Sequence, residues 1–111
     1  MDQRVVITGI GIYSCLGQNL ETVKQSLYQG KSGIILDEAR KEFGFRSGLT
    51  GFVPEPDLKS LLSRRQRIGM HQPAMYAYMS TLEALHLAGL DPEYLDAHET
   101  GIIFGNDSTA A

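Results

Sequence analysis

The stretch that most constrains the fold is residues 4–17, which read RVVITGIGIYSCLG. The β-branched run at residues 5–8 has no polar alternation, which is typical of a strand buried on both faces in a helix-covered parallel sheet. Gly9 and Gly11 follow, and without a Cβ they let the backbone turn or approach a neighbour closely. Asn19 then leads into a helix, so the stretch predicts strand, turn and helix in an α/β fold.

Two helices are expected to be well defined. Residues 19–30 carry an apolar stripe between an asparagine suited to the N-cap and a glycine suited to the C′ position. Residues 73–88 begin with proline, stop before glycine and are apolar on nearly every side, which predicts a long helix buried in a larger body. Weaker patterns predict a helical turn at 37–43, a short helix at 58–62, another turn at 91–93 and an extended segment at 48–53.

The end of the sequence predicts a second buried strand, at residues 101–105, with the sequence GIIFG. A sheet covered on both faces needs further elements to close its edge and pack its second face. We therefore expect the chain to be the front part of a larger protein.

Composition excludes several classes of protein. A net charge of −3 over 111 residues gives no sign of nucleic-acid binding, which would need a basic face. No apolar run approaches the roughly 20 residues of a membrane span, and the first residues do not resemble a secretory signal. Because a single cysteine excludes an internal disulfide and fits a reducing compartment, the cytoplasm is the expected location.

The glycines after the first strand invite comparison with dinucleotide-binding turns. The pattern G-x-G-x-x-G would need glycine at Ser14, and the pattern T-G-x-x-x-G-x-G would need glycine at Tyr13 and Cys15. Both patterns fail. We therefore expect the glycines to serve close packing rather than phosphate binding.

Neither the cysteine nor the histidines form a recognisable reactive or metal-binding group. Cys15 has no base nearby in sequence, so we interpret it as a small buried apolar residue. His71, His86 and His98 lack ligand spacing such as i, i+4, so no metal site is expected. His86 fits a hydrogen-bonded core residue or a group at the rim of the long helix.

The basic cluster Arg64, Arg65 and Arg67 precedes the long helix. One interpretation is a solvated surface loop. The other is a docking patch for an acidic partner. Guanidinium groups bind carboxylates and phosphates through paired hydrogen bonds, and their charge steers an acidic partner towards the surface. Both remain open on the sequence alone.

Four segments in order resemble the N-terminal portion of the β-ketoacyl-acyl carrier protein synthases, which are condensing enzymes of the thiolase-like superfamily. The resemblance is closest to the type I elongating enzymes. It lies in VITGIG with the following SCLG, in GKSGI at residues 30–34, in MHQPAMYAYMSTLEALHLAGL at residues 70–90, and in GIIFGND at residues 101–107.

That resemblance implies that residues 1–111 are the first part of a β-ketoacyl synthase N-terminal domain. The fold would be a layered α-β-α arrangement with a mostly parallel buried sheet and a long buried helix. The complete protein would be an acyltransferase joining an acyl group on a cysteine thiolate to malonyl-carrier protein, with loss of carbon dioxide. It would act as a homodimer or with a related subunit. No cofactor is implied, since the phosphopantetheine arm of acyl carrier protein carries the substrates.

The resemblance assigns no catalytic residue to this chain, because the nucleophile and histidines of the family would come after Ala111. It aligns Arg64 and Arg65 with paired basic residues that dock the carrier protein. The family usually has a third arginine slightly later, followed by an aromatic residue, whereas here Arg67 comes one place early and Ile68 follows it. It also implies that an acyl tunnel is bordered by Asn106, Asp107 and Ser108, with Ser108 at the tunnel floor.

The tunnel residues are bulkier and more polar than the family's small ones, which hints at a polyene or aryl-primed acyl substrate. Two alternatives keep the resemblance without catalysis by this chain. One is a chain-length-factor-like partner, in which the nucleophilic cysteine is replaced and the subunit only shapes the tunnel. The other is a stand-alone interaction module or an inactive truncated product. A sharp two-state melt of residues 1–111 would count against the expectation that they are only the front part of a larger protein.

Overall fold

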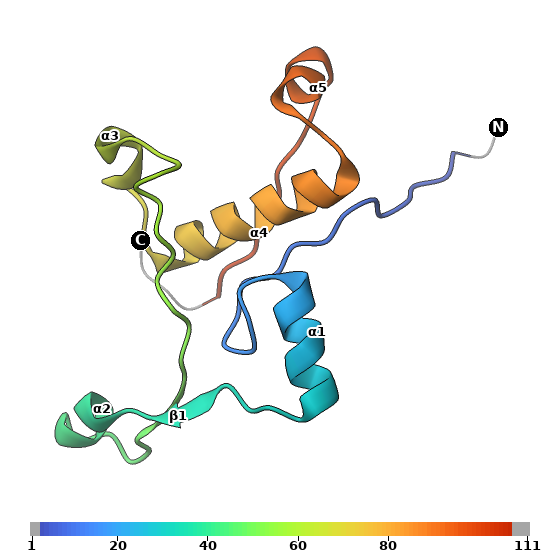
Figure 1. Cartoon of the computed structure of the whole chain (residues 1–111). Coiled ribbons are helices and arrows are strands. Elements are labelled where there is room, and N and C mark those ends of the chain that lie inside the picture. The colour runs from blue at the N-terminus through green and yellow to red at the C-terminus, as the bar shows by residue number, and fades with distance from the viewer. Residues whose placement is uncertain (1–2, 108–111) are drawn as a thin grey trace.

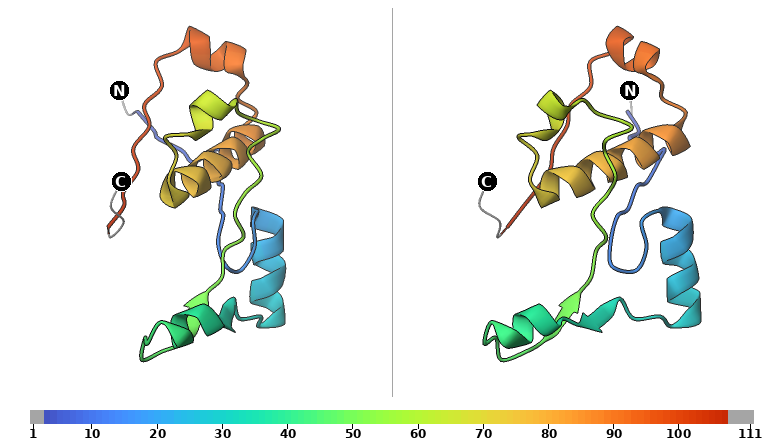
Figure 2. Two further views of the ribbon diagram at one scale, coloured as in Figure 1. Left: turned by 90° about the vertical axis from the view of Figure 1, so that its left-hand side faces the viewer. Right: turned by 60° about the vertical axis from the view of Figure 1, so that its left-hand side comes forward.

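A computed structural model describes residues 3–107, which form five helices and one two-stranded sheet (Figure 1). Their radius of gyration is 17.3 Å, against about 13 Å for a compact domain of this length. Figure 2 shows why: α5 and the small sheet lie at opposite ends of an elongated body, with the long helix α4 between them. No helix within residues 3–107 has the length and apolar character that crossing a membrane requires.

Helix α1 (Leu20–Gln29) begins and ends where the sequence predicts. The Asn19 side chain accepts from the Thr22 amide, and the Thr22 hydroxyl accepts from the Asn19 amide, which completes a reciprocal capping box. Gly30 ends the helix at a φ of 65°, a left-handed conformation that glycine adopts without strain. Both ends of the helix are therefore determined locally.

The sheet is an antiparallel pair, β1 (Ile34–Leu36) with β2 (Leu49–Gly51), in which Ile35 lies opposite Thr50. Helix α2 (Glu38–Glu42) connects the two strands along the chain, and Asp37 caps its N-terminus. The predicted turn at 37–43 and extended segment at 48–53 are confirmed. Strand β1 was not predicted, because between the first helix and residue 48 the sequence pattern indicates only the turn at 37–43.

The predicted strands at residues 5–8 and 101–105 are extended but belong to no sheet among the described residues. Val5 is 97% exposed and Ile103 is 98% exposed. A strand exists only through hydrogen bonds to a neighbouring strand, and residues 3–107 offer these segments none. The mostly parallel sheet is therefore not formed within the described residues.

The long helix α4 (Gln72–Ala88) matches the prediction of 73–88, with a proline in its first turn and Gly89 ending it at a φ of 72°. Helix α5 (Pro92–Ala97) follows, capped by Asp91. The predicted helix at 58–62 is wrong: these residues make one turn, and α3 (Arg64–Arg67) follows it. Ser63 terminates that turn because its side chain caps α3 instead.

The core of the described residues is small. Val23 of α1 and Leu58 before α3 are buried, whereas the side chains of α4 are half-buried or exposed. The expected burial of α4 is therefore only partial here, because one helix crossed by two extended segments keeps part of its surface open.

Candidate functional site

Helix α4 is crossed by the glycine-rich segment, residues 9–13. Gly9 lies against Ala84 and Ala88, and Gly11 lies one turn earlier, against Ser80. These three helix residues are spaced by four and share one face of α4. The segment therefore runs along a stripe of small residues towards the N-terminal end of the helix.

The two glycines are required by this contact. A Cβ on Gly11 would overlap the Ser80 carbonyl and lie 3.0 Å from the Ala84 nitrogen. A Cβ on Gly9 would overlap the Ala84 carbonyl and lie 2.9 Å from the Ala88 nitrogen. The atoms in the way belong to the helix backbone and cannot rotate aside, so the close-packing role predicted for the glycines is confirmed.

Glu83 ties α4 to both the crossing segment and α1. One carboxylate oxygen accepts from the Ile12 amide at 2.9 Å, and the other accepts from the Leu20 amide at 2.8 Å. The Leu20 amide opens α1, where unpaired N–H groups and the helix dipole favour a negative charge. One side chain therefore orients the turn and the helix that follows it.

Tyr13 completes the crossing. Its ring stacks on Tyr76 of α4 with centroids 5.4 Å apart, and its hydroxyl donates to the Pro54 carbonyl at 2.7 Å. Burial of the phenol, together with the nearby Tyr76, raises the pKa of Tyr13 above its usual value. The neutral phenol is therefore the form that this contact stabilises.

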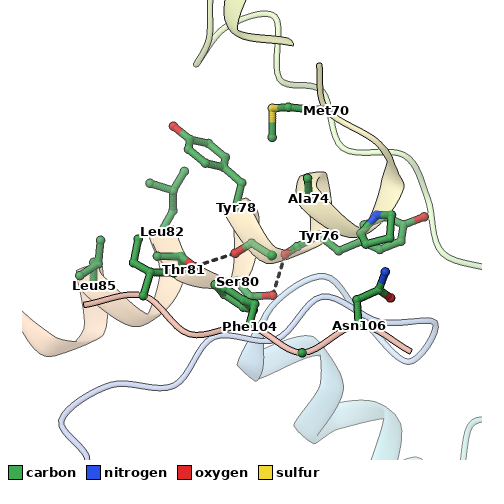
Figure 3. A pocket seen from close by; sticks show the side chains of 14 residues that line it. Met70, Ala74, Tyr76, Tyr78, Ser80, Thr81, Leu82, Leu85, Phe104 and Asn106 are labelled. Carbon is green, nitrogen blue, oxygen red and sulfur yellow. Dashed lines mark hydrogen bonds between the residues drawn. The ribbon is translucent and has the colours of Figure 1, made fainter. Parts of the chain in front are cut away.

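On another side of α4 an apolar groove of about 780 Å³ runs between the helix and residues 102–106. Figure 3 shows Phe104 beneath Ser80 and Thr81, with Asn106 further along towards the start of the helix. Ser80 and Thr81 donate to the carbonyls of Tyr76 and Ala77 one turn back, so their hydroxyls leave the groove mostly apolar. The groove can receive an apolar chain or an apolar protein surface.

The predicted tunnel residues do not all line the groove. Asn106 lines the groove, and Asp107 is exposed after it. Ser108 lies outside the described residues. The structure therefore brings only Asn106 to the groove.

The predicted docking residues lie on α3, away from this groove. Arg64 and Arg65 are exposed, and Arg67 is half-buried. Ser63 and Gln66 form a capping box that begins the helix. The basic cluster is thus a defined helical turn and not an irregular loop.

Cys15 packs against the backbone of Gly33, just before β1, and of Gly51 at the end of β2. A Cβ on Gly33 would lie 2.7 Å from the thiol, and one on Gly51 would lie 3.3 Å from it. The thiol is half-buried and unpaired. Cys15 therefore is a packing residue as predicted, but it is half-buried and not fully buried.

The histidines do not meet. His86 is exposed in the last turn of α4, which selects the rim alternative, and the His98 ring stacks on Tyr94 and contacts its carbonyl. Within residues 3–107 no three His, Cys, Asp or Glu side chains cluster as metal ligands would.

Sequence reasoning missed Glu83 and the Tyr13–Tyr76 pair. The signal for Glu83 was available, because it is the lone acidic residue in a helix that is mostly apolar. The tyrosines gave no such signal, because a stack between residues 63 positions apart depends on the path of the chain.

The family model for the β-ketoacyl synthase N-terminal domain matches residues 2–111. The chain belongs to the β-ketoacyl synthase family. It is 38% identical over 105 residues to 3-oxoacyl-[acyl-carrier-protein] synthase 1 of Escherichia coli (strain K12), covering 94% of this chain and 26% of that protein. The synthase 1 of Buchnera aphidicola from Acyrthosiphon pisum is 36% identical, with the same coverage. That of Haemophilus influenzae is 36% identical over 109 residues, which are 98% of this chain and 27% of that protein.

The chain thus spans about a quarter of the length of the curated relatives it matches. Membership of the family carries the thiolase-like α/β fold class with it, and the resemblance found in the sequence is confirmed.

Proposed function

We propose that this chain is the N-terminal part of a 3-oxoacyl-acyl carrier protein synthase of fatty acid or polyketide assembly. The single observation that carries the proposal is the match of nearly the whole chain to synthase 1 relatives at 36–38% identity. The acyl group would be held as a thioester on a cysteine outside residues 1–111. Loss of carbon dioxide from malonyl-carrier protein yields a carbanion that attacks this thioester, forms a carbon–carbon bond and releases the thiolate.

This reaction suits a thiolate at a helix N-terminus, where the dipole lowers the thiol pKa and backbone amides stabilise the oxyanion. This chain supplies no group to that step. Its part is to build the scaffold and the surface that the carrier protein meets, with no cofactor beyond the carrier's phosphopantetheine arm. The complete protein acts in the cytoplasm as a homodimer or with a related subunit.

Residues 5–8 and 101–105 are neighbouring strands of a mostly parallel sheet in the complete protein, and α4 covers one face of it. Two observations support this. Residues 9–13 run towards the N-terminal end of α4, and the segment from α5 to Asn106 runs the same way along the helix (Figures 1 and 3). Residues 5–8 and 101–105 expose apolar side chains and belong to no sheet among the described residues, as strands awaiting neighbours do.

Arg64 and Arg65 dock the acidic carrier protein. Their exposure at the surface of α3 supports this role, because accessible guanidinium groups can steer and bind carboxylates. Asn106, Asp107 and Ser108 border the acyl tunnel and adapt it to a polyene or aryl-primed chain. For Asn106 the support is its position at the apolar groove.

The test is condensation by the complete protein, with acyl-carrier protein and malonyl-carrier protein as substrates and mass spectrometry of the product. We expect 3-oxoacyl-carrier protein, and we expect Cys15→Ala to retain the activity while iodoacetamide still abolishes it in that variant. Loss of acylation in a folded Cys15→Ala protein would contradict the assignment of the nucleophile outside this chain. A folded protein that makes no product alone but sets product length with a partner would be the chain-length-factor alternative.

A further inference from the structure

Arg67 differs from its two neighbours in where its side chain goes. Its Nε–H donates to the Leu62 carbonyl at 3.3 Å, back across the N-terminal end of α3. The side chain is half-buried and lines a hollow of about 460 Å³, whose mixed polar and apolar lining includes Asp57 and Lys59. Arg64 and Arg65 make no such return contact and are exposed.

Helix α3 depends on such a contact because it is very short. Four residues complete a single turn, which is not stable by itself. Its capping box, Ser63 with Gln66, is local and gives it no fixed direction. The turn before it is anchored by Leu58, which is only 4% exposed and whose carbonyl accepts from the Leu62 amide. The Arg67 bond to Leu62 joins α3 to that anchored turn.

The outward surface of α3 then contains two cations and an apolar residue. Ile68 is 74% exposed, and it follows Arg64 by four positions, so the two side chains share a face. An acidic partner could pair with the arginines and cover Ile68 in the same contact.

We infer that Arg67 is a positioning residue for α3, and that the carrier protein meets Arg64, Arg65 and Ile68 instead of three cations. The inference rests on the proposed function, because the carrier protein is the partner named there. It removes one charge from the docking surface and adds one apolar contact.

The test compares methionine variants of the complete protein, because methionine preserves an unbranched apolar stem. Binding to acyl carrier protein is measured at low and high salt. Arg64→Met and Arg65→Met each weaken binding about two- to fivefold at low salt, and the loss shrinks at high salt as charges are screened. Arg67→Met also weakens binding, because a disordered α3 misplaces Arg64 and Arg65, and this loss keeps their salt dependence. Ile68→Ala gives a salt-independent loss of about threefold.

Hydrogen exchange of the amides of residues 67 and 68 tests the positioning role without any partner. These amides donate to the Ser63 and Arg64 carbonyls, so they report whether α3 is formed. They should exchange faster in Arg67→Met and unchanged in Arg65→Met. Unchanged exchange in Arg67→Met, or equally faster exchange in Arg65→Met, would overturn the inference. Unaltered carrier binding in both Arg64→Met and Arg65→Met would instead refute the proposed docking function, while exchange still judges Arg67.

Discussion

The two extended segments that lie along α4 contact it in different ways. Residues 9–13 are joined to the helix by glycine packing, by Glu83 and by the Tyr13–Tyr76 stack. Residues 101–107 lie over an apolar groove and remain exposed. The first segment follows a predicted strand at residues 5–8, and the second contains one at residues 101–105, and both strands were predicted from a short apolar run ended by glycine.

The difference shows which contacts a segment can complete with the helix alone. The glycines and Tyr13 of the first segment find their partners on α4, and Glu83 of α4 accepts from the Ile12 amide of the segment. Together these contacts determine one relative position. Isoleucine and phenylalanine side chains need a surface that covers them on all sides. The first segment is therefore specified within this chain, and the second needs further structure.

Gly11→Ala should have the largest effect on that comparison. The added Cβ overlaps the Ser80 carbonyl, so the segment must lift from α4 at a cost of about 3 kcal/mol in the free energy of unfolding. Denaturant unfolding measures the loss. Gly69→Ala is the matched control, because nothing lies within 4 Å of its Cβ position. Equal effects of the two changes would show that the close crossing is not needed.

Glu83→Ala should cost about 2 kcal/mol, because two amides lose a charged acceptor. Glu83→Gln should recover part of this, since its single amide oxygen can accept from one of the two amides. The measurement is again the free energy of unfolding, with exposed Glu99→Ala as the control. If Glu83→Ala matched Glu99→Ala, the carboxylate would not join α1 to α4.

Tyr13→Phe should cost about 1 kcal/mol by removing the hydrogen bond to Pro54 while leaving the stack. The pKa of Tyr13 is raised by burial and by Tyr76, so its stabilisation is fully present below the unfolded pKa near 10 and is lost as pH rises through the folded pKa. Between pH 9 and 11 the free energy of unfolding should therefore fall more steeply in the unmodified protein than in Tyr13→Phe. Parallel curves would contradict this.

Ile103→Ala should have the smallest effect. The side chain is 98% exposed, so in residues 1–111 the free energy of unfolding should change by less than about 0.5 kcal/mol. In a complete protein where this segment is a buried strand, the same change should cost about 3 kcal/mol. A small effect in both would argue against the proposed sheet.

Much of the local structure was predictable. Asn19, Gly30, Asp37, Asp91 and Gly89 mark helix ends through their own backbone preferences and side-chain hydrogen bonds, and the structure confirms each. The extent of α3 was missed because the cap at Ser63 competes with the apolar pattern of residues 58–62. The antiparallel pairing of β1 with β2 was missed because a three-residue strand has too little alternation to be recognised.

The site divides in the same way. Residue types identified the basic cluster, but only the fold separates Arg67, which bonds back to Leu62, from the exposed Arg64 and Arg65. The placement of Asn106 at an apolar groove likewise depends on the path of residues 102–106 along α4.

By itself the sequence determined the helix ends, the requirement for close-packed glycines and the family. These depend on backbone preferences over a few residues, or on side chains in a recognisable order. Only the tertiary structure decided that Glu83 joins two elements, that Tyr13 stacks on Tyr76 and that the third arginine turns inward. The physical reason is that Glu83 and Tyr13 bond to atoms distant along the chain, and Arg67 takes its direction from the packing of the turn before α3.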